Sequence, residues 1–153
     1  MARLSQLPEP MRSHLAGLPL PSFDATPFVA GPPLPERRVA IVSTAGLHRR
    51  SDPAYLPAAA DYRVIPGDVD GRDLVMSHIS TNFDRTGFQQ DVNVVFPIER
   101  LRELAQRGEI GAVAALHFSF MGATDPQAMS GAADEVAQML RQDGVSAVLL
   151  VPV

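Results

Sequence analysis

Residues 126–151, PQAMSGAADEVAQMLRQDGVSAVLLV, decide the fold, because they place a helix directly before a strand. Asp125 can cap the helix, Pro126 fits its first position, and Gly144 stops it. Residues 145–151 are apolar except for one serine, which is typical of a strand buried on both faces. A helix that runs into such a strand is half of a strand–helix–strand unit, so we expect a parallel sheet.

Segments upstream supply the rest of the expected domain. Residues 39–43, VAIVS, form a run rich in β-branched side chains, typical of a second buried strand. Residues 62–65 predict a shorter strand at an edge, and residues 92–96 predict a further short strand. Pro97 can begin another helix, whose apolar face consists of Ile98, Leu101, Leu104 and Ala105. The sequence therefore predicts an α/β fold with three layers and a mostly parallel sheet.

The chain divides into an N-terminal arm, residues 1–37, and the α/β domain, residues 38–153. A short helix can follow Pro10, with apolar residues at helical spacing. The six prolines between positions 19 and 35 then favour an extended segment. We expect the arm to pack on the domain through Phe23, Phe28 and Val29.

Composition excludes several classes of protein. The 153 residues include 46% hydrophobic and 20% charged residues, which fits one globular domain. The net charge of −4 and the scattered basic residues argue against nucleic acid as a partner. Cysteine is absent, so disulfides and thiolate metal sites are excluded within this sequence. No apolar run could span a membrane, and prolines interrupt the N-terminus where a signal peptide would be apolar, so we expect a cytoplasmic protein.

The loop after the strand at 39–43 is the main candidate site. Residues 43–48, STAGLH, should lie at the carboxyl edge of the sheet, where open α/β sheets bind ligands. Hydroxyls and backbone N–H groups there could bind a carboxylate or phosphate, and we predict Thr44, Gly46 and His48 as substrate-binding residues. An ordinary turn explains the same residues equally well. Neither a dinucleotide fingerprint nor a P-loop pattern is present.

A second polar stretch, SHISTNFD at residues 77–84, adds further candidates for substrate binding. His78 and Asp84 could form an orienting pair for acid–base chemistry, or they could be a structural histidine and a turn residue. The four histidines lack the spacing of metal ligands, so we expect no metal site. A serine hydrolase is disfavoured, because no G-x-S-x-G motif exists and Ser77 has no evident base in the sequence. Residues 117–122, HFSFMG, could form a pocket wall or pack in the core.

The sequence ends directly after the last predicted strand, at Val153. That strand is hydrophobic enough to be central, and each of its aliphatic side chains left exposed would forgo about 1.5–3 kcal/mol. A truncated domain and a finished core explain this ending equally well. In both cases we expect Val153 to lie at the ligand-binding edge.

Several blocks of the sequence resemble the substrate-specific protein B of the glycine, sarcosine and betaine reductases, a family with D-proline reductase relatives. The similarity covers about residues 36–153 in the same order, through blocks at 38–53, 62–68, 77–78, 91–104, 108–111 and 117–122. The resemblance implies a thiol- or selenol-dependent reductase that cleaves a C–N bond of a small, polar, amino acid-like substrate. It also implies a pyruvoyl group on a partner subunit, and none in this chain.

The resemblance further implies a selenocysteine or cysteine nucleophile in a motif that would follow immediately after Val153. We therefore hypothesise that the next codon is an in-frame UGA, read as selenocysteine in the cell. A reductase partner subunit or a thiol or selenol electron carrier is the expected partner, and a homo-oligomer stays open. The stretch after His78 lacks additional His and Asp residues of the larger family members, so their substrates cannot be transferred. The alternative is a non-catalytic small-molecule-binding or regulatory subunit of a reductase complex.

Overall fold

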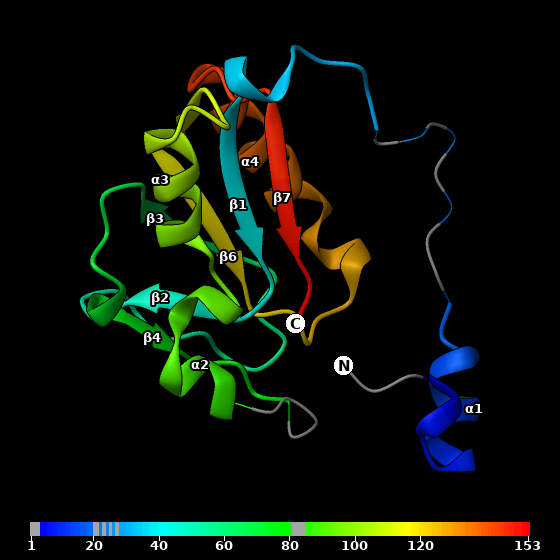
Figure 1. The fold of residues 1–153 in the computed structure, drawn as a ribbon. Coiled ribbons are helices and arrows are strands. Elements are labelled where there is room, and N and C mark those ends of the chain that lie inside the picture. Colours follow the sequence, from blue (N-terminus) through cyan, green and yellow to red (C-terminus); the bar gives the residue numbers. More distant parts are fainter. Residues whose placement is uncertain (1–3, 20–21, 23, 25, 27, 81–84) are drawn as a thin grey trace.

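A curled, mostly parallel sheet of five strands forms the centre of an α/β fold (Figure 1). The computed structural model describes residues 4–19, 22, 24, 26, 28–80 and 85–153. The strands of the sheet are β1 (Arg38–Ser43), β3 (Tyr62–Pro66), β5 (Ala112–Val113), β6 (Leu116–Phe120) and β7 (Ala147–Val151). Strands β5, β6 and β7 all run parallel to β1, whereas β3 runs antiparallel to β6.

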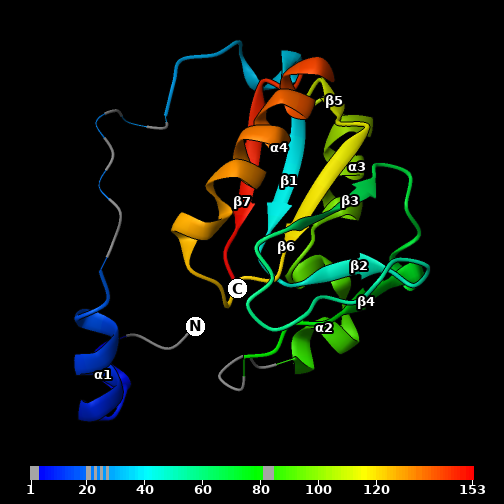
Figure 2. The ribbon, with the colours of Figure 1, turned by 180° about the vertical axis from the view of Figure 1, so that it is seen from behind.

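Strands are confirmed within the three predicted stretches 39–43, 62–65 and 145–151, as β1, β3 and β7. The prediction that residues 145–151 are buried on both faces was wrong, because β7 is paired only with β1 among the described residues and its three central side chains are exposed. Strand β3 lies at an edge, as predicted. Strand β7 pairs with β1 from Val39 opposite Ala147 to Ser43 opposite Val151, which brings two segments far apart in sequence side by side (Figure 2). Strand β6 occupies residues that the sequence left open between a pocket wall and core packing, and four of its five residues are buried. The structure therefore favours core packing for most of that stretch.

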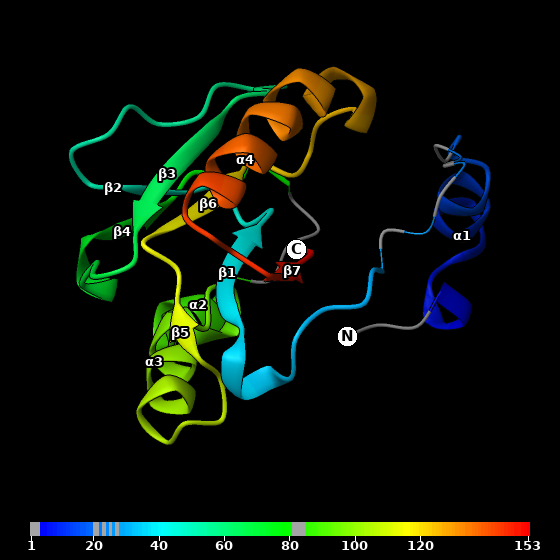
Figure 3. The ribbon, with the colours of Figure 1, turned by 90° about the horizontal axis from the view of Figure 1, so that it is seen from above.

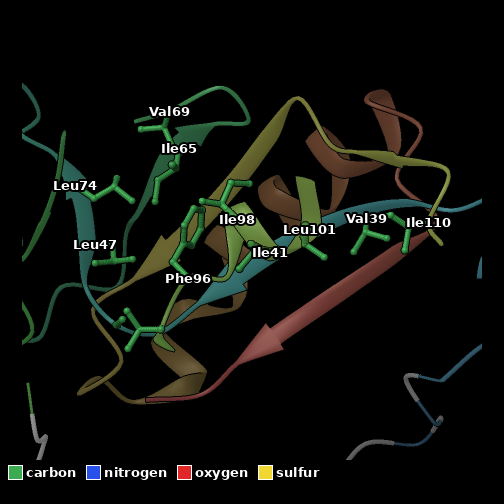
Figure 4. Close-up of a cluster of buried hydrophobic side chains, with 12 residues drawn as sticks. Val39, Ile41, Leu47, Ile65, Val69, Leu74, Phe96, Ile98, Leu101 and Ile110 are labelled. Carbon is green, nitrogen blue, oxygen red and sulfur yellow. The ribbon is translucent and has the colours of Figure 1, made fainter. Parts of the chain in front are cut away.

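The two longest helices, α3 (Ile98–Gln106) and α4 (Ser130–Gln142), lie on opposite sides of the sheet (Figure 3). On the α3 side, alternate residues of β1 pack against the apolar face predicted for this helix. The buried cluster there is drawn in Figure 4 and includes Val39, Ile41, Phe96, Ile98 and Leu101. On the α4 side, Phe118 and Phe120 of β6 pack against Val136. The alternation of side chains along each strand thus creates two apolar clusters.

Smaller elements surround the carboxyl edge of this sheet. Strands β2 (Leu47–Arg49) and β4 (Leu74–Met76) form a separate antiparallel pair, and α2 (Thr86–Gln90) lies near them (Figure 1).

Helix α1 (Glu9–Ala16) is the short helix predicted around Pro10. The single 3-10 turns are η1 (Leu4–Gln6), η2 (Leu34–Glu36), η3 (Gly71–Asp73), η4 (Val92–Val94) and η5 (Pro126–Met129).

The prediction of a strand at residues 92–96 was wrong, because residues Val92–Val94 form the 3-10 turn η4. The Asp91 carboxylate accepts hydrogen bonds from the backbone N–H of Asn93 at 2.9 Å and from its side-chain amide at 2.8 Å. Such a local bond stabilises a turn in preference to an extended strand. Asp125 acts in the same way, since its carboxylate accepts from Gln127 N and begins η5 rather than α4 itself.

Two expectations about the whole chain stay predictions. Phe28 and Val29 are 86% and 83% exposed, and Phe23 lies outside the described residues. The packing of the arm on the domain is therefore not confirmed and stays a prediction. The exposed side chains of β7 likewise leave the complete three-layer form a prediction. In the part of the chain that the structure describes, no helix is long and apolar enough to cross a membrane.

Candidate functional site

The carboxyl ends of β1, β6 and β7 meet at one edge, next to the β2–β4 pair (Figure 2). The backbone N–H of Thr44 donates to Val151 O at 3.1 Å, and that of Gly46 donates to Phe120 O at 2.8 Å. These two bonds tie the loop after β1 to the ends of both neighbouring strands. The prediction that this loop lies at the carboxyl edge is therefore confirmed.

Val153 lies directly beside Thr44, at this same edge. The Thr44 hydroxyl oxygen accepts a hydrogen bond from Val153 N at 2.9 Å, and the hydroxyl lies 3.5 Å from Val153 O. The predicted position of Val153 at the carboxyl edge of the sheet is thus confirmed, and the binding of a ligand at this edge stays a prediction. Because consecutive Cα atoms are about 3.8 Å apart, any residue that follows Val153 would begin at the Thr44 loop.

Gly46, Gly122 and His78 approach one another closely at the bottom of this edge. Both glycines have a left-handed backbone, with φ of +65° and +83°. A Cβ atom at Gly46 would lie 2.9 Å from His78 N, and one at Gly122 would lie 3.1 Å from His78 Nε2 and would clash with Thr44 O. The structure therefore brings together Thr44, Gly46 and His78, which were predicted as candidates from two separate stretches of the sequence, and adds Gly122, which the sequence assigned only to a turn.

The backbone part of the predicted anion cradle is wrong. The N–H groups of the loop all point into the protein: besides the bonds of Thr44 and Gly46, Ala45 N donates to the Ser43 hydroxyl at 3.2 Å and Leu47 N to the Ser119 hydroxyl at 2.9 Å. Each N–H is taken by a buried acceptor, so none remains for a ligand. The predicted groups of this edge that remain are the Thr44 hydroxyl and the His78 ring, and substrate binding by them stays a prediction.

His78 is a buried, neutral histidine at this edge. Its side chain is 5% exposed, and its Nδ1 accepts from Ser80 N at 3.2 Å, so the neutral ring carries its proton on Nε2. Burial and, to a smaller extent, the Arg85 guanidinium lower the pKa of His78. Asp84 lies outside the described residues, so the predicted pair of His78 and Asp84 stays a prediction.

His48 is also buried, and both of its ring nitrogens are engaged within the protein. Nδ1 donates to Arg49 O at 2.8 Å, since a carbonyl oxygen can only accept, and Nε2 therefore accepts from the Ser77 hydroxyl at 2.7 Å. The structure thus gives Ser77 the base that the sequence did not reveal. Ser77 N also donates to Gly46 O at 2.9 Å, so the pair of His48 and Ser77 connects the site loop to β4. Direct substrate binding by His48 stays a prediction.

Tyr55 supports the site and had no signal in the sequence. Its hydroxyl donates to Ser119 O, its ring meets the His48 ring edge-on at 6.3 Å, and the Arg63 guanidinium lies 4.4 Å from its ring centre. Burial raises the pKa of this hydroxyl, so it stays protonated as a donor. These contacts fix the segment between β2 and β3 against β6. They join residues as much as 64 positions apart, which local patterns cannot reveal.

His117 is part of the core and not of the candidate site. Its side chain is fully buried, and its Nδ1 accepts from Ile41 N of β1 at 2.8 Å. Within the described part of the chain, Nε2 has no hydrogen-bond partner. Burial, with a smaller effect of the Arg102 charge, lowers the pKa of His117 to about 4. The ring therefore stays neutral at physiological pH and replaces a backbone acceptor in the sheet.

A pocket of about 760 Å³ lies away from the carboxyl edge, between η3, α2 and α3. Its polar groups already serve the fold: Asp70 and Asp91 cap 3-10 turns, and the Arg102 guanidinium donates to Gly67 O and Val69 O at 2.8 Å. Among the described residues, no group of three or more carboxylate or histidine side chains could hold a metal ion. None of the predicted site residues lines this cavity, so size alone does not mark it as the site.

Comparison with known proteins identifies the family. A family model described as glycine/sarcosine/betaine reductase selenoprotein B matches residues 11–153. D-proline reductase subunit gamma of Acetoanaerobium sticklandii is 37% identical over 120 residues, which cover 76% of this chain and 49% of that protein. Sarcosine reductase complex component B subunit beta of Peptoclostridium acidaminophilum is 29% identical over 138 residues, covering 86% of this chain and 32% of that protein. This chain thus spans about half the length of the first relative and about a third of the second.

A further relative belongs to the glycine reductases. Glycine reductase complex component B subunit gamma of Symbiobacterium thermophilum is 30% identical over 142 residues, covering 86% of this chain and 32% of that protein. No solved structure gives a significant match. The family match covers the α/β domain and most of the arm, including every residue of the carboxyl-edge site. The chain belongs to the glycine/sarcosine/betaine reductase selenoprotein B family.

Proposed function

We propose that this chain forms the substrate-anchoring part of a thiol- or selenol-dependent reductase that cleaves a C–N bond of a small amino acid-like molecule. The relatives are subunits of D-proline, sarcosine and glycine reductases, which supports a reductase role. The observation that carries the proposal is the bond from Val153 N to the Thr44 hydroxyl at 2.9 Å. It supports a position beside Thr44, Gly46 and His78 for a residue that follows Val153.

A selenocysteine or cysteine immediately after Val153 would therefore attack at this edge. The chalcogenide forms a bond to the substrate carbon as the C–N bond breaks, and the amine leaves with the electron pair and one proton. A dithiol then supplies two electrons: the carbon gains hydrogen, the chalcogenide is released, and the dithiol becomes a disulfide. The net change is one C–N bond replaced by C–H and N–H bonds.

The side chains of this chain would anchor and orient the substrate. The Thr44 hydroxyl accepts a hydrogen bond from Val153 N, and Gly46 and Gly122 allow the neighbouring loops to pack closely beside it. His78 Nε2–H points to the same loops and could donate to the departing amine, with Asp84 as its proposed orienting partner. A pyruvoyl group would belong to a partner subunit, and a thiol or selenol carrier would deliver the electrons. Both remain parts of the proposal.

The first test is the intact mass and selenium content of the protein made from its native gene in its native host. We expect a mass above 16.4 kDa, selenium bound to the protein, and labelling by iodoacetamide. A cysteine-free product of 16.4 kDa that contains no selenium would overturn the proposal. In that case binding of D-proline, glycine, sarcosine or betaine without turnover would favour the non-catalytic subunit.

The second test uses matched variants of that native product in a dithiol-dependent assay of C–N cleavage. Thr44→Val removes only the hydroxyl, and we expect a loss in kcat/KM of about tenfold, as for one hydrogen bond. His78→Gln removes the proposed donor, and we expect a loss of about 100-fold or more. Thr26→Val and His14→Gln, both at exposed positions of the N-terminal arm, should keep full activity. Equal effects in the test and control variants would contradict the proposed site.

A further inference from the structure

The segment that carries His78 lies outside the main sheet and follows the small β2–β4 pair (Figures 1 and 2). The paired residues of these two strands end with Leu47 opposite Met76. One further backbone bond follows, from Ser77 N to Gly46 O at 2.9 Å. His78 comes one residue beyond this bond, so the contacts of Ser77 are the last constraint that the strand pair places on its backbone.

Ser77 has a second hydrogen bond, through its side chain. Its hydroxyl donates to His48 Nε2 at 2.7 Å. His48 lies opposite Val75, and Ser77 follows two residues later, so alternation places the side chains of His48 and Ser77 on one face as diagonal neighbours. The same alternation directs the His78 ring to the opposite face, where its Nε2 lies against Gly122. Ser77 therefore holds the backbone on one face while the His78 ring meets the site on the other.

The His48 ring is itself held in one orientation. It is 5% exposed, its Nδ1 donates to Arg49 O at 2.8 Å, and its edge meets the Tyr55 ring at 6.3 Å. A flipped ring would place carbon atoms where the two nitrogens now bond and would lose both hydrogen bonds. Tyr55 is fixed in turn by its bond to Ser119 O of β6. The Ser77 hydroxyl is thus bonded to a group that cannot readily move.

The His78 ring has little room beside the two glycines. A Cβ atom at Gly122 would lie 3.1 Å from His78 Nε2, and one at Gly46 would lie 2.9 Å from His78 N. The Thr44 loop does not depend on Ser77 for its own position, because Thr44 N and Gly46 N are bonded to the ends of β7 and β6. Loss of the Ser77 side-chain bond would therefore move His78 relative to a loop that stays in place.

A hydroxyl bonded to a histidine also occurs in serine nucleophiles, but the surroundings of Ser77 do not suit that chemistry. Acyl transfer needs N–H donors for the oxyanion that develops. The N–H groups of residues 44–47 all donate to buried acceptors, and Ser77 N donates to Gly46 O. His48 is also too buried to pass a proton to a leaving group. The bond between His48 and Ser77 is better suited to holding a neighbour in place.

We propose that Ser77 and His48 are positioning residues, whose hydrogen bond holds the His78 imidazole beside Thr44. The inference rests on the proposed function, in which His78 Nε2–H donates to the departing amine. Neither Ser77 nor His48 touches the substrate, and both act through His78. His48 thus has a positioning role in place of direct substrate binding.

Kinetics of the native product in the dithiol-dependent assay test this role. Ser77→Ala removes the hydroxyl, and we expect kcat to fall by about tenfold, since a misplacement of about 1 Å can cost about 100-fold. KM should change by less than about twofold, because Thr44 keeps its place. Ser77→Thr keeps the hydroxyl and should keep kcat within about twofold of the parent. His48→Phe keeps a buried ring but loses both hydrogen bonds, so its loss in kcat should equal that of Ser77→Ala.

Double variants separate positioning of His78 from a general loss of structure. In the His78→Gln background the proposed donor is already absent, so the addition of Ser77→Ala should cause no further loss in kcat. Ser77→Ala combined with His48→Phe should lose no more than either single variant, because both changes remove the same bond. Losses that multiply in either double variant would overturn the proposal.

The His78 ring can also be observed without turnover, by NMR of the native product labelled at histidine. In the parent, burial and the Arg85 charge lower the pKa of His78. We expect Ser77→Ala to shift the His78 ring resonances and to raise this pKa toward the ordinary value of 6.5, because a displaced ring is less buried. Ser77→Thr should leave the resonances and the pKa as in the parent.

Val136→Ala is the matched control for lost stability. It opens a cavity in the cluster on the α4 side, away from the bond between His48 and Ser77, and should leave kcat and the His78 resonances unchanged. A parent-like kcat in Ser77→Ala, or unmoved His78 resonances, would overturn the positioning role and leave the reductase activity intact. Absence of turnover in the parent would instead refute the proposed function, and the NMR result would still decide whether the bond positions His78.

Discussion

Acidification should destabilise this protein through His117. The ring is fully buried, its Nδ1 accepts from Ile41 N at 2.8 Å, and its pKa is lowered to about 4 from the ordinary 6.5. Protonation would place a positive charge in the core and turn the acceptor Nδ1 into a second donor facing an N–H. The unfolded chain binds this proton more readily, so the free energy of unfolding is complete above about pH 6.5 and falls as the pH approaches 4.

The size of this effect follows from the difference between the two pKa values. Each pKa unit is equivalent to 1.36 kcal/mol. For a shift from 6.5 to about 4, the free energy of unfolding of the protein falls by about 2 kcal/mol between pH 7.5 and pH 5. Well below pH 4 the full difference, on the order of 3 kcal/mol, would be lost. Losses of this size are a large fraction of the stability of a small domain.

The assay is urea unfolding at several pH values between 4.5 and 7.5. His117→Asn keeps an acceptor oxygen near the position of Nδ1 but cannot titrate, so its unfolding free energy should vary less with pH than that of the parent, by about 2 kcal/mol at pH 5. His14→Gln, at an exposed helix position, is the control and should keep the parent slope. Proton NMR of the ring would measure the pKa even if the Asn variant did not fold. A His117 pKa near 6.5 would refute the reasoning.

Two further substitutions test the packing of the carboxyl edge. Gly122→Ala should lower the free energy of unfolding by about 1–3 kcal/mol or more, because the backbone has φ of +83° and the new Cβ would clash with Thr44 O. The matched control is Gly108→Ala, which has φ of +72° and open space around it and should cost only about 1 kcal/mol. Equal losses of the two variants in urea unfolding would contradict the clash. Tyr55→Phe should lower the free energy of unfolding by about 1–3 kcal/mol, because it leaves the buried Ser119 carbonyl without the tyrosine donor. Tyr62→Phe loses an exposed hydrogen bond to Glu135 and should change the free energy by less than about 0.5 kcal/mol. Similar small losses in both variants would show that the buried bond contributes little.

Much of the sheet could be predicted because its strands have local signatures. The runs at β1 and β7 are continuous and apolar, and Gly144, with φ of +69°, marks the turn between α4 and β7. Residues 92–96 have a similar composition, yet the Asp91 carboxylate bonds to the next backbone groups and makes a turn. Strand propensity alone cannot register such competition between side chain and backbone.

The candidate site could be located from the sequence but not described. The meeting of Thr44, Gly46 and Val153 follows from the rule that parallel strands end at one edge. The direction of the loop N–H groups could not be derived from the sequence, because two of their acceptors belong to β6. Gly46 N donates to Phe120 O, and Leu47 N donates to the Ser119 hydroxyl, which lies more than 70 positions away in the sequence. The same holds for the bond between His48 and Ser77, across 29 positions. Tertiary pairing, and not local pattern, decides which polar groups are left for a ligand.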